Sequence, residues 1–334
     1  MKAVILSSKD SPISIDDIPA PEQHEDNILI ALQASALNHR DVWISKGLYA
    51  QIQYPVIPGS DGAGIVIASA SKLIPNGSRV LINPNINWGD ETSTQSSKYE
   101  ILGMPTQGTM AEMISVPAHR VHAIPEHLTF EHAAALPLAG LTAYRAVFTK
   151  GFIQSGQSVL ITGIGGGVAL MAMQFAIAAG AHVYCISGSQ SKIDKAIELG
   201  AKGGANYKEE GWERQLHSSI PQGFDCIIDS AGGEQWNQLT GLLKAGGRLV
   251  FYGATHGNVP NLAIHRLFWK QITICGSTMG SDAEFEMMLH FCDHHHIIPC
   301  IDSIHALEDA SHAFSLMEQG QQFGKIVLHH AQKV

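Results

Sequence analysis

The stretch "VLITGIGGGVALMAMQFAIAAGAHVYCIS" covers residues 159 to 187 and decides the fold of the region around it. An apolar strand leads into a string of glycines, which is followed by an apolar helix and a second apolar strand. Strands and helices continue to alternate further along the chain, as in parallel βαβ units with helices on both faces of a sheet. The stretch therefore predicts a doubly wound α/β domain.

The glycine string has the setting of a dinucleotide-binding loop. Only glycine turns so tightly and lets backbone amides approach a pyrophosphate, whose charge then lies at the positive end of the following helix. Read as G-x-x-G-x-x-A, the series is Gly163, Gly166 and Ala169. A glycine-rich turn without a ligand is the alternative. The expected phosphate contacts are Gly163, Gly165, Gly166, Gly167 and Val168.

The end of the second strand distinguishes the two nicotinamide cofactors. An Asp or Glu about 20 residues beyond the loop would bind the free ribose hydroxyls and repel a 2'-phosphate. Here the strand ends at Ser187, Ser189 and Lys192 follow, and no acid precedes Asp194. Hydroxyls and a lysine suit a phosphate, which predicts NADP(H). The alternative is that these residues cap and solvate the next helix.

The length of 334 residues and a change in the pattern of predicted strands and helices along the chain predict two domains. Residues 1–125 contain short β-type runs separated by Pro, Gly and Asn turns, which predicts a mostly β unit. Residues 126–265 carry the strand and helix alternation. Residues 266–334 are expected to complete the edge of the cofactor sheet and to return to the first domain.

Composition narrows the partners and the compartment. The net charge of -9, without a Lys or Arg cluster, argues against nucleic acid and anionic membranes and favours a small-molecule substrate. The sequence has no apolar run near the roughly 20 residues that span a bilayer, and its first residues turn polar too early for a signal peptide. Five scattered cysteines without C-x-x-C spacing are typical of reduced thiols. We expect a cytoplasmic protein.

Several motifs occur in an order that resembles one family. They are "ALNHRDVWISKGLY" (36–49), "YPVIPGSDGAGIV" (54–66), "GTMAEMISVP" (108–117), "LPLAGLTAYRAV" (136–147) and "GGRLVFYG" (246–253). With the glycine loop, they resemble the medium-chain dehydrogenases and reductases, in particular the zinc-free branch similar to quinone oxidoreductases and its YogA-like relatives. The resemblance implies a GroES-like catalytic domain, a Rossmann cofactor domain and a homodimer formed through the edge strand "QITICG".

The zinc positions of the resembling family are changed in this chain. Where the zinc-using members have Cys, a His-Glu pair and a further Cys, Asp or Glu, this sequence has Asn38, Ser60, Asp61 and Leu138. Zinc needs three or four deprotonated soft or borderline ligands, so we expect no catalytic zinc. Residues 80–120 lack the four cysteines of the structural zinc loop as well. His290 and His294 have metal-ligand spacing, but a solvated helix end is the favoured interpretation.

Without a metal, the substrate must already be activated by conjugation, as in a quinone or an α,β-unsaturated carbonyl compound. The candidates for catalysis are Asn38, Asp41 and Tyr49, which the resemblance assigns to the interdomain cleft. Each also has a structural alternative, as a helix cap, an ion-pair partner or packing. His39 is a weaker candidate.

By resemblance, further cofactor contacts are expected at Thr142, Tyr207, Gly253, Ser277 and Lys325. Two other functions stay open: an alcohol dehydrogenase that binds zinc through atypical ligands, and a non-enzymatic NADPH-binding protein with a sensing or structural role.

Overall fold

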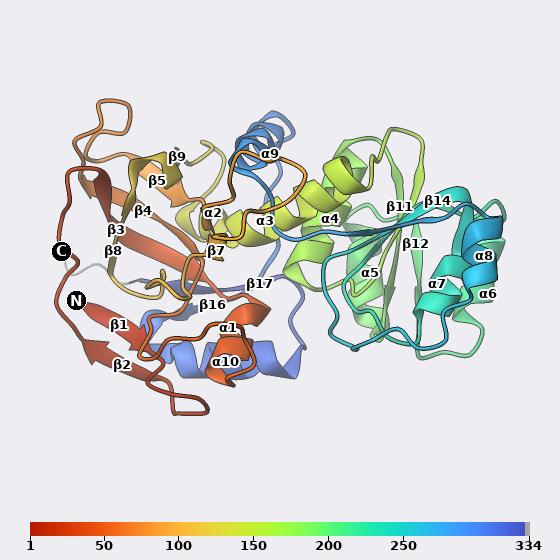
Figure 1. Cartoon of the computed structure of the whole chain (residues 1–334), viewed down its shortest axis with the longest axis horizontal. Helices are drawn as coiled ribbons and strands as arrows, with labels where there is room; N and C mark the ends of the chain where they lie inside the picture. Colours follow the sequence, from red (N-terminus) through yellow and green to blue (C-terminus); the bar gives the residue numbers. More distant parts are fainter. Residues whose placement is uncertain (331–334) are drawn as a thin grey trace. The chain divides into compact units, whose positions relative to one another are not determined.

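Two sheets organise the chain, which forms two units in a computed structural model that describes residues 1–330 (Figure 1). Unit 1 consists of Met1–Leu141 and Gly280–Val334, and unit 2 consists of Thr142–Met279. Among the described residues, none of the helices is long and apolar enough to cross a bilayer.

Unit 2 is built on a six-stranded sheet in which every neighbouring pair is parallel. Its strand order is β12-β11-β10-β13-β14-β15, so the chain winds outward from β10 in both directions. The strands are β10 (Ser158–Ile161), β11 (His182–Ser187), β12 (Gly203–Asn206), β13 (Phe224–Asp229), β14 (Leu243–Phe251) and β15 (Thr273–Gly276). The predicted doubly wound domain is confirmed.

Helices connect these strands as the sequence pattern predicts. They are α4 (Gly167–Ala178), α5 (Gln190–Glu198), α6 (Trp212–Ser219), α7 (Trp236–Leu242) and α8 (Ile264–Trp269), and the π-helix η2 (Arg145–Lys150) precedes the first strand, β10. Helix α4 is apolar along most of its length, and seven of its residues are buried. Helix α5 buries only Ile193 and Ala196 and exposes most of its other positions.

Unit 1 contains a seven-stranded sheet with the order β16-β17-β3-β4-β5-β9, in which β8 pairs with the free part of β3. The strands are β3 (Asn27–Ala36), β4 (Asp61–Ala68), β5 (Arg79–Ile82), β8 (Met113–Pro117), β9 (Val121–Ala123), β16 (Ile301–Ala306) and β17 (Lys325–His329). Two hairpins complete the unit, β1 (Lys2–Ile5) with β2 (Ser14–Asp17), and β6 (Asn85–Ile86) with β7 (Glu100–Ile101).

The central strand of unit 1 follows the period of two expected for a sheet with one covered face, since Ile28, Ile30, Leu32 and Ala34 are buried in alternation. Strand β4 approaches β3 so closely that a Cβ on Gly64 would lie 2.2 Å from the carbonyl oxygen of Ala31. Glycine is therefore required at this position.

The helices of unit 1 are α1 (His39–Ser45), α2 (Phe130–Ala135), α3 (Pro137–Tyr144, which crosses into unit 2), α9 (Asp282–His294) and α10 (Ala310–Gln319), with short 3-10 turns η1 (Ala118–Arg120) and η3 (Leu307–Asp309). Helix α10 joins a core that includes residues from β1 and β17.

The units divide later than the boundaries expected at residues 125 and 265. Residues 126–141 stay with unit 1 because α2 packs against β3 and β4. Residues 266–279 stay with unit 2 because β15 pairs in parallel with β14. Strand β15 is the edge of the cofactor sheet that the sequence predicted for the return segment. The hydrogen bonding of the strands sets the boundary between the two units, and the pattern of residues along the chain does not reveal that bonding.

The end of β17 carries a buried histidine. His330 follows the strand, is almost fully buried, and its Nε2 lies 2.9 Å from the hydroxyl oxygen of Ser35 on β3. Burial lowers the pKa of His330 to about 4. The folded state therefore favours the neutral imidazole more strongly than the unfolded state does.

We predict an acid-sensitive stability that depends on His330. Because its folded pKa is depressed from 6.5 to about 4, its contribution is fully present above pH 6.5 and is lost as the pH falls towards 4. The loss is on the order of 3 kcal/mol. Urea unfolding at pH 7 and 4.5 should show a smaller change in unfolding free energy for His330→Gln than for the wild type. The exposed-site control His217→Gln should behave like the wild type, and an equal acid response of His330→Gln would contradict the prediction.

Candidate functional site

Three polar residues of unit 1 meet because of the strand order. Strand β3 lies between β17 and β4 and is antiparallel to both, so its end faces the starts of the two neighbours. Ala36 on β3 pairs with Asp61 on one side and with Val327 on the other. Asn38, two residues beyond the end of β3, therefore lies beside Asp61 and Lys325.

The contacts in this cluster are short and buried. Lys325 Nζ donates to Asp61 Oδ2 at 2.9 Å and to Asn38 Oδ1 at 2.6 Å. Asn38 Nδ2 donates to Asp61 Oδ2 at 2.9 Å, and Asp61 Oδ1 accepts from the backbone N–H of Leu138 at 2.8 Å. The exposed fractions are 8% for Asn38, 3% for Lys325 and 0% for Asp61. We name these three residues the Asn-Asp-Lys cluster.

Asp41, a predicted catalytic residue, lies in the first turn of α1 with both carboxylate oxygens bound to backbone amides. Oδ2 accepts from Asn38 N at 2.8 Å and Oδ1 accepts from Gly59 N at 3.2 Å. The residue is fully buried, and burial raises the pKa of Asp41. In the structure both oxygens of this carboxylate fix backbone groups, and the catalytic role of Asp41 stays a prediction.

Tyr49, the third predicted catalytic residue, is half-buried and is held by Arg40. Arg40 Nε donates to the Tyr49 hydroxyl oxygen at 3.4 Å, and the guanidinium carbon lies 4.9 Å from the centre of the ring. Arg40 Nη1 also donates to Ser60 Oγ at 2.6 Å and to the carbonyl of Leu102 at 2.8 Å. Sequence reasoning did not assign Arg40 this role, although it lies in the same motif as Asn38 and Asp41.

His39 lies at the surface beside the same cluster. Partial loss of hydration and, second, the Lys325 ammonium lower the pKa of His39. Both effects favour the neutral imidazole.

The residues present do not fit a catalytic zinc. Asn38, Ser60 and Leu138 offer an amide, a hydroxyl and a hydrocarbon at three of the four family positions, and the Lys325 ammonium already binds the oxygens of Asn38 and Asp61. In residues 1–330, no group of three or more His, Cys, Asp or Glu side chains could hold a metal ion. His290 and His294 lie exposed on α9.

The lobe that carries the structural zinc loop in the resembling family is held here by aromatic packing. Trp88 is almost fully buried and meets Tyr99 edge to face, with ring centres 5.2 Å apart. Its indole Nε1 donates to the carbonyl of Glu91 at 3.0 Å.

The five cysteines are free, and burial raises the pKa values of Cys185, Cys226 and Cys292 to about 12. None of these three thiols is activated.

In unit 2, the glycine string forms the turn between β10 and α4. Gly163 and Gly165 have φ values of 63° and 118°, where only glycine is unstrained, and Gly166 caps α4 directly before Gly167 and Val168. A Cβ on Gly165 would lie 2.7 Å from Lys192 Cδ and 3.4 Å from Lys192 Nζ. The Lys192 side chain therefore lies against Gly165, two residues before α4 begins.

The end of β11 gathers hydroxyl groups and a second lysine. Ser189 N donates to Ser187 Oγ at 3.3 Å. A Cβ on Gly188 would lie 2.8 Å from both the Tyr207 hydroxyl oxygen and Lys208 Cε. The structure thus brings together the predicted residues Ser187, Ser189 and Tyr207, and adds Lys208, which sequence reasoning missed although it adjoins Tyr207.

Asp229 at the end of β13 fixes the loop beside the glycine string. Its Oδ1 accepts from Thr162 Oγ1 at 2.6 Å, and its Oδ2 accepts from Gly232 N at 2.8 Å and Trp236 Nε1 at 2.9 Å. The residue is almost fully buried. The sequence did not single out this carboxylate, because an acid at the end of an apolar strand gives no sign of which groups donate hydrogen bonds to it.

The remaining predicted cofactor residues of unit 2 lie at other strand ends. A Cβ on Gly253 would lie 2.6 Å from the carbonyl oxygen of Ser230, which requires glycine there. The Ser277 hydroxyl is buried and has no hydrogen-bond partner among the described residues. Thr142 is buried with its hydroxyl 3.7 Å from the sulfur of Met279. A glycine cradle, two lysines and an orphaned hydroxyl fit a dinucleotide cofactor.

Lys325, for which a cofactor contact is predicted, lies in unit 1, where its ammonium is bound to Asn38 and Asp61. Its contact with the cofactor stays a prediction.

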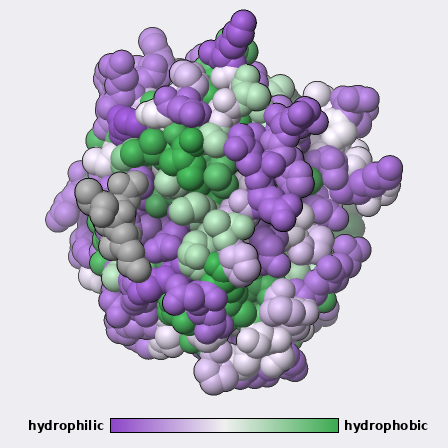
Figure 2. Space-filling view, turned by 90° about the vertical axis from the view of Figure 1, so that its left-hand side faces the viewer, coloured by the Kyte–Doolittle hydropathy of each residue, from purple (hydrophilic) through white to green (hydrophobic). Residues whose placement is uncertain are grey.

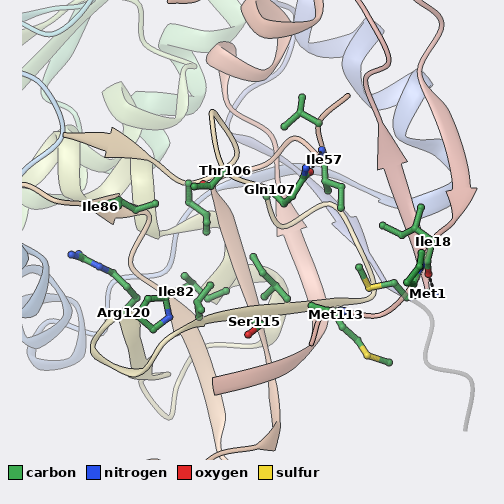
Figure 3. A pocket seen from close by; sticks show the side chains of 18 of the residues that line it. Met1, Ile18, Ile57, Ile82, Ile86, Thr106, Gln107, Met113, Ser115 and Arg120 are labelled. Carbon is green, nitrogen blue, oxygen red and sulfur yellow. Dashed lines mark hydrogen bonds between the residues drawn. The ribbon is translucent and has the colours of Figure 1, made fainter. Parts of the chain in front are cut away.

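Unit 1 also contains an apolar groove of about 740 Å³ (Figure 3). Its lining includes Met1, Ile18, Ile57, Ile82, Met113 and Leu102. Figure 2 shows apolar side chains gathered on the face of the molecule that carries the N-terminus. Asn38, Asp41, Tyr49 and Lys325 do not line the groove, so this pocket is separate from the Asn-Asp-Lys cluster. Leu102 separates the two, since its carbonyl accepts from Arg40 and Ser60.

Comparison with known proteins agrees with this architecture. Residues 24–126 match the family model described as alcohol dehydrogenase GroES-like domain, which confirms the predicted catalytic domain, and residues 167–294 match the one described as zinc-binding dehydrogenase.

Among curated proteins, the chain is 34% identical to a zinc-type alcohol dehydrogenase-like protein YogA from Leptosphaeria maculans, over 95% of this chain and 94% of that protein. It is 29% identical to the human synaptic vesicle membrane protein VAT-1 homolog, over 93% of this chain and 80% of that protein. Among solved structures, an NAD-dependent alcohol dehydrogenase superposes with a TM-score of 0.93 at 32% identity, over 98% of this chain and 99% of that one. The chain belongs to the medium-chain dehydrogenase/reductase superfamily, an oxidoreductase family that binds nicotinamide cofactors.

Proposed function

We propose that the protein is an NADPH-dependent, zinc-independent oxidoreductase that reduces quinones or α,β-unsaturated carbonyl compounds. The observation that carries the proposal is the Lys325 ammonium bound between Asn38 and Asp61, in a donor set that does not fit zinc. Without a Lewis acid, an unactivated alcohol or ketone is a poor substrate, whereas a conjugated acceptor is already electrophilic.

The residues of unit 1 take the acceptor side of this reaction. When bound, the reduced nicotinamide supplies a hydride, and the acceptor takes up that hydride and one proton. The amide of Asn38 donates a hydrogen bond to the acceptor oxygen, where negative charge develops. The Tyr49 hydroxyl, held by Arg40, provides a second donor. Asp41 fixes the backbone of Asn38 and Gly59.

The residues of unit 2 take the cofactor side. The amides of Gly163 to Val168 and the N-terminus of α4 would hold the pyrophosphate. Ser187, Ser189, Lys192, Tyr207 and Lys208 would hold the 2'-phosphate, because lysines and hydroxyls bind phosphate as charged and neutral donors. Thr142, Gly253 and Ser277 would border the nicotinamide half. The orphaned Ser277 hydroxyl supports this assignment.

An NAD-dependent alcohol dehydrogenase is the second candidate, because a structure with that title is similar at 32% identity. A non-enzymatic cofactor-binding role is the third, and it is the one for which binding without turnover is expected.

The first prediction for this function combines turnover with metal analysis. Protein purified without chelator should contain far less than one zinc per chain and should oxidise NADPH in the presence of quinones or enals, with EDTA having no effect. Inductively coupled plasma mass spectrometry and nicotinamide absorbance provide the measurements. Near-stoichiometric zinc with alcohol oxidation would favour the second candidate, and tight NADPH binding without turnover would favour the third.

The second prediction concerns cofactor preference. Lys192→Ala should weaken NADPH binding roughly 10- to 100-fold, because a charge-assisted hydrogen bond to phosphate contributes about 1.5–3 kcal/mol. NADH binding should change much less. Fluorescence titration of both cofactors tests this, with Lys202→Ala on the same unit as a control at an exposed lysine. Equal weakening of the two cofactors would show that Lys192 does not read the 2'-phosphate.

We also propose that the protein forms a homodimer through the edge of the unit 2 sheet. Strand β15 ends the sheet, and α8 beside it in sequence exposes Ile264, Phe268 and Trp269 by 69%, 68% and 81%. An unpaired strand edge flanked by exposed apolar side chains is typical of a contact surface. A twofold dimer would cover both features.

Light scattering coupled to size-exclusion chromatography should therefore give a dimer mass for the wild type. Trp269→Glu should raise the dissociation constant by about 30-fold or more, as expected for an interface tryptophan. Leu73→Glu is the matched control, since Leu73 is 93% exposed but lies in unit 1. A monomeric wild type, or equal masses of the Trp269 variant and the wild type at dilution, would rule out this interface.

A further inference from the structure

Lys325 and Asp61 form an ion pair that is almost completely removed from water. The exposed fractions are 3% for Lys325 and 0% for Asp61. Burying such a pair costs more desolvation than an apolar pair of similar volume, so stability alone does not account for it. By contrast, the ion pair of Lys2 with Glu308, which is also in unit 1 and 2.8 Å long, lies at the surface.

The buried pair fixes the orientation of the Asn38 amide. Its Oδ1 accepts from the ammonium at 2.6 Å and its Nδ2 donates to the carboxylate at 2.9 Å. Rotating the amide by 180° would bring Nδ2 against an ammonium and Oδ1 against a carboxylate, and both contacts would be repulsive. The two charges thus leave the amide one orientation.

The second N–H of this amide has no partner among the described residues. One hydrogen of Nδ2 is used by Asp61, and the other is left. With 8% of its surface exposed, Asn38 is the member of the cluster most accessible to solvent. An ammonium bound to the carbonyl end of an amide draws electron density from the N–H end, which strengthens that donor.

We propose that Lys325 is a positioning residue whose buried ammonium orients and polarises the Asn38 amide, so that its second N–H binds the oxyanion that develops on the acceptor. The inference rests on the proposed function for the identity of the acceptor. In this role an internal cation acts through an amide, and the protein stabilises the enolate or quinol oxygen without a metal.

A double-mutant cycle tests whether Lys325 acts through Asn38. Lys325→Met should lower kcat about 100-fold, as the loss of one oxyanion donor does, with little change in the KM for NADPH. Asn38→Ala should lower kcat similarly. Because both changes remove the same N–H contact, the double variant should be no slower than Asn38→Ala alone. If the two effects multiply, Lys325 acts independently of Asn38 and the proposal is wrong.

Two further variants control for folding. Lys2→Met removes the surface ion pair with Glu308 and should leave kcat unchanged. Lys325→Met combined with Asp61→Asn replaces the buried ion pair by a neutral one, and should keep the unfolding temperature near that of the wild type while kcat stays low. Recovery of kcat in this variant would show that Lys325 only neutralises Asp61, and would overturn the proposal.

Binding of 4-nitrophenol in the presence of NADP+ provides a readout that does not require turnover. The ionised phenol mimics an enolate, and its visible absorbance reports the fraction bound as the anion. The wild type should bind the anion, whereas Lys325→Met and Asn38→Ala should lose about 100-fold in affinity. Anion binding that depends on Lys325, in a protein without quinone or enone turnover, would support the inference and reject the proposed substrates. If the wild type reduces quinones or enones and the Lys325→Met variant is equally active, the proposed substrates are supported and the inference about Lys325 is rejected.

Discussion

The buried ion pair between Lys325 and Asp61 is the interaction on which the polar centre of unit 1 depends. It joins the first residue of β17 to the first residue of β4, across the end of β3. Lys325 comes from the last strand of the chain, and Asp61 comes from near its beginning. Because both charges lie out of water, neither can be left without the other. Asn38 completes the arrangement by accepting from one and donating to the other.

A second constraint organises unit 2, where backbone geometry shapes the loops that follow two neighbouring strands. The turn after β10 needs positive φ angles at Gly163 and Gly165, and the loop after β13 is fixed by the acceptors of Asp229. Both loops follow neighbouring strands at the point where the sheet order reverses. In open parallel sheets, this is where a ligand binds. In the proposed function the two units therefore have different roles: unit 2 would hold the phosphates, and unit 1 would supply oriented donors.

The predictions that held best rest on local sequence. The strand expected before the glycine string is β10, and the apolar helix expected after that string is α4, because period and glycine position are properties of neighbouring residues. Asp41 was less predictable. Its place three residues after Asn38 indicates a cap, but only the fold shows that its second oxygen binds Gly59. Arg40, Lys208 and Asp229 were missed for the same reason, since their partners lie elsewhere in the chain.

By itself, the sequence determined the doubly wound sheet, the glycine cradle, the mostly β first domain and the replacement of the zinc ligands, because each depends on residue type and spacing along the chain. The tertiary structure decided where the units divide, what Asp41 binds and why Lys325 belongs beside Asn38. The physical reason is strand register: hydrogen bonding of β17 and β4 to the two sides of β3 brings together residues that lie more than 260 positions apart in the sequence. No local pattern encodes that pairing.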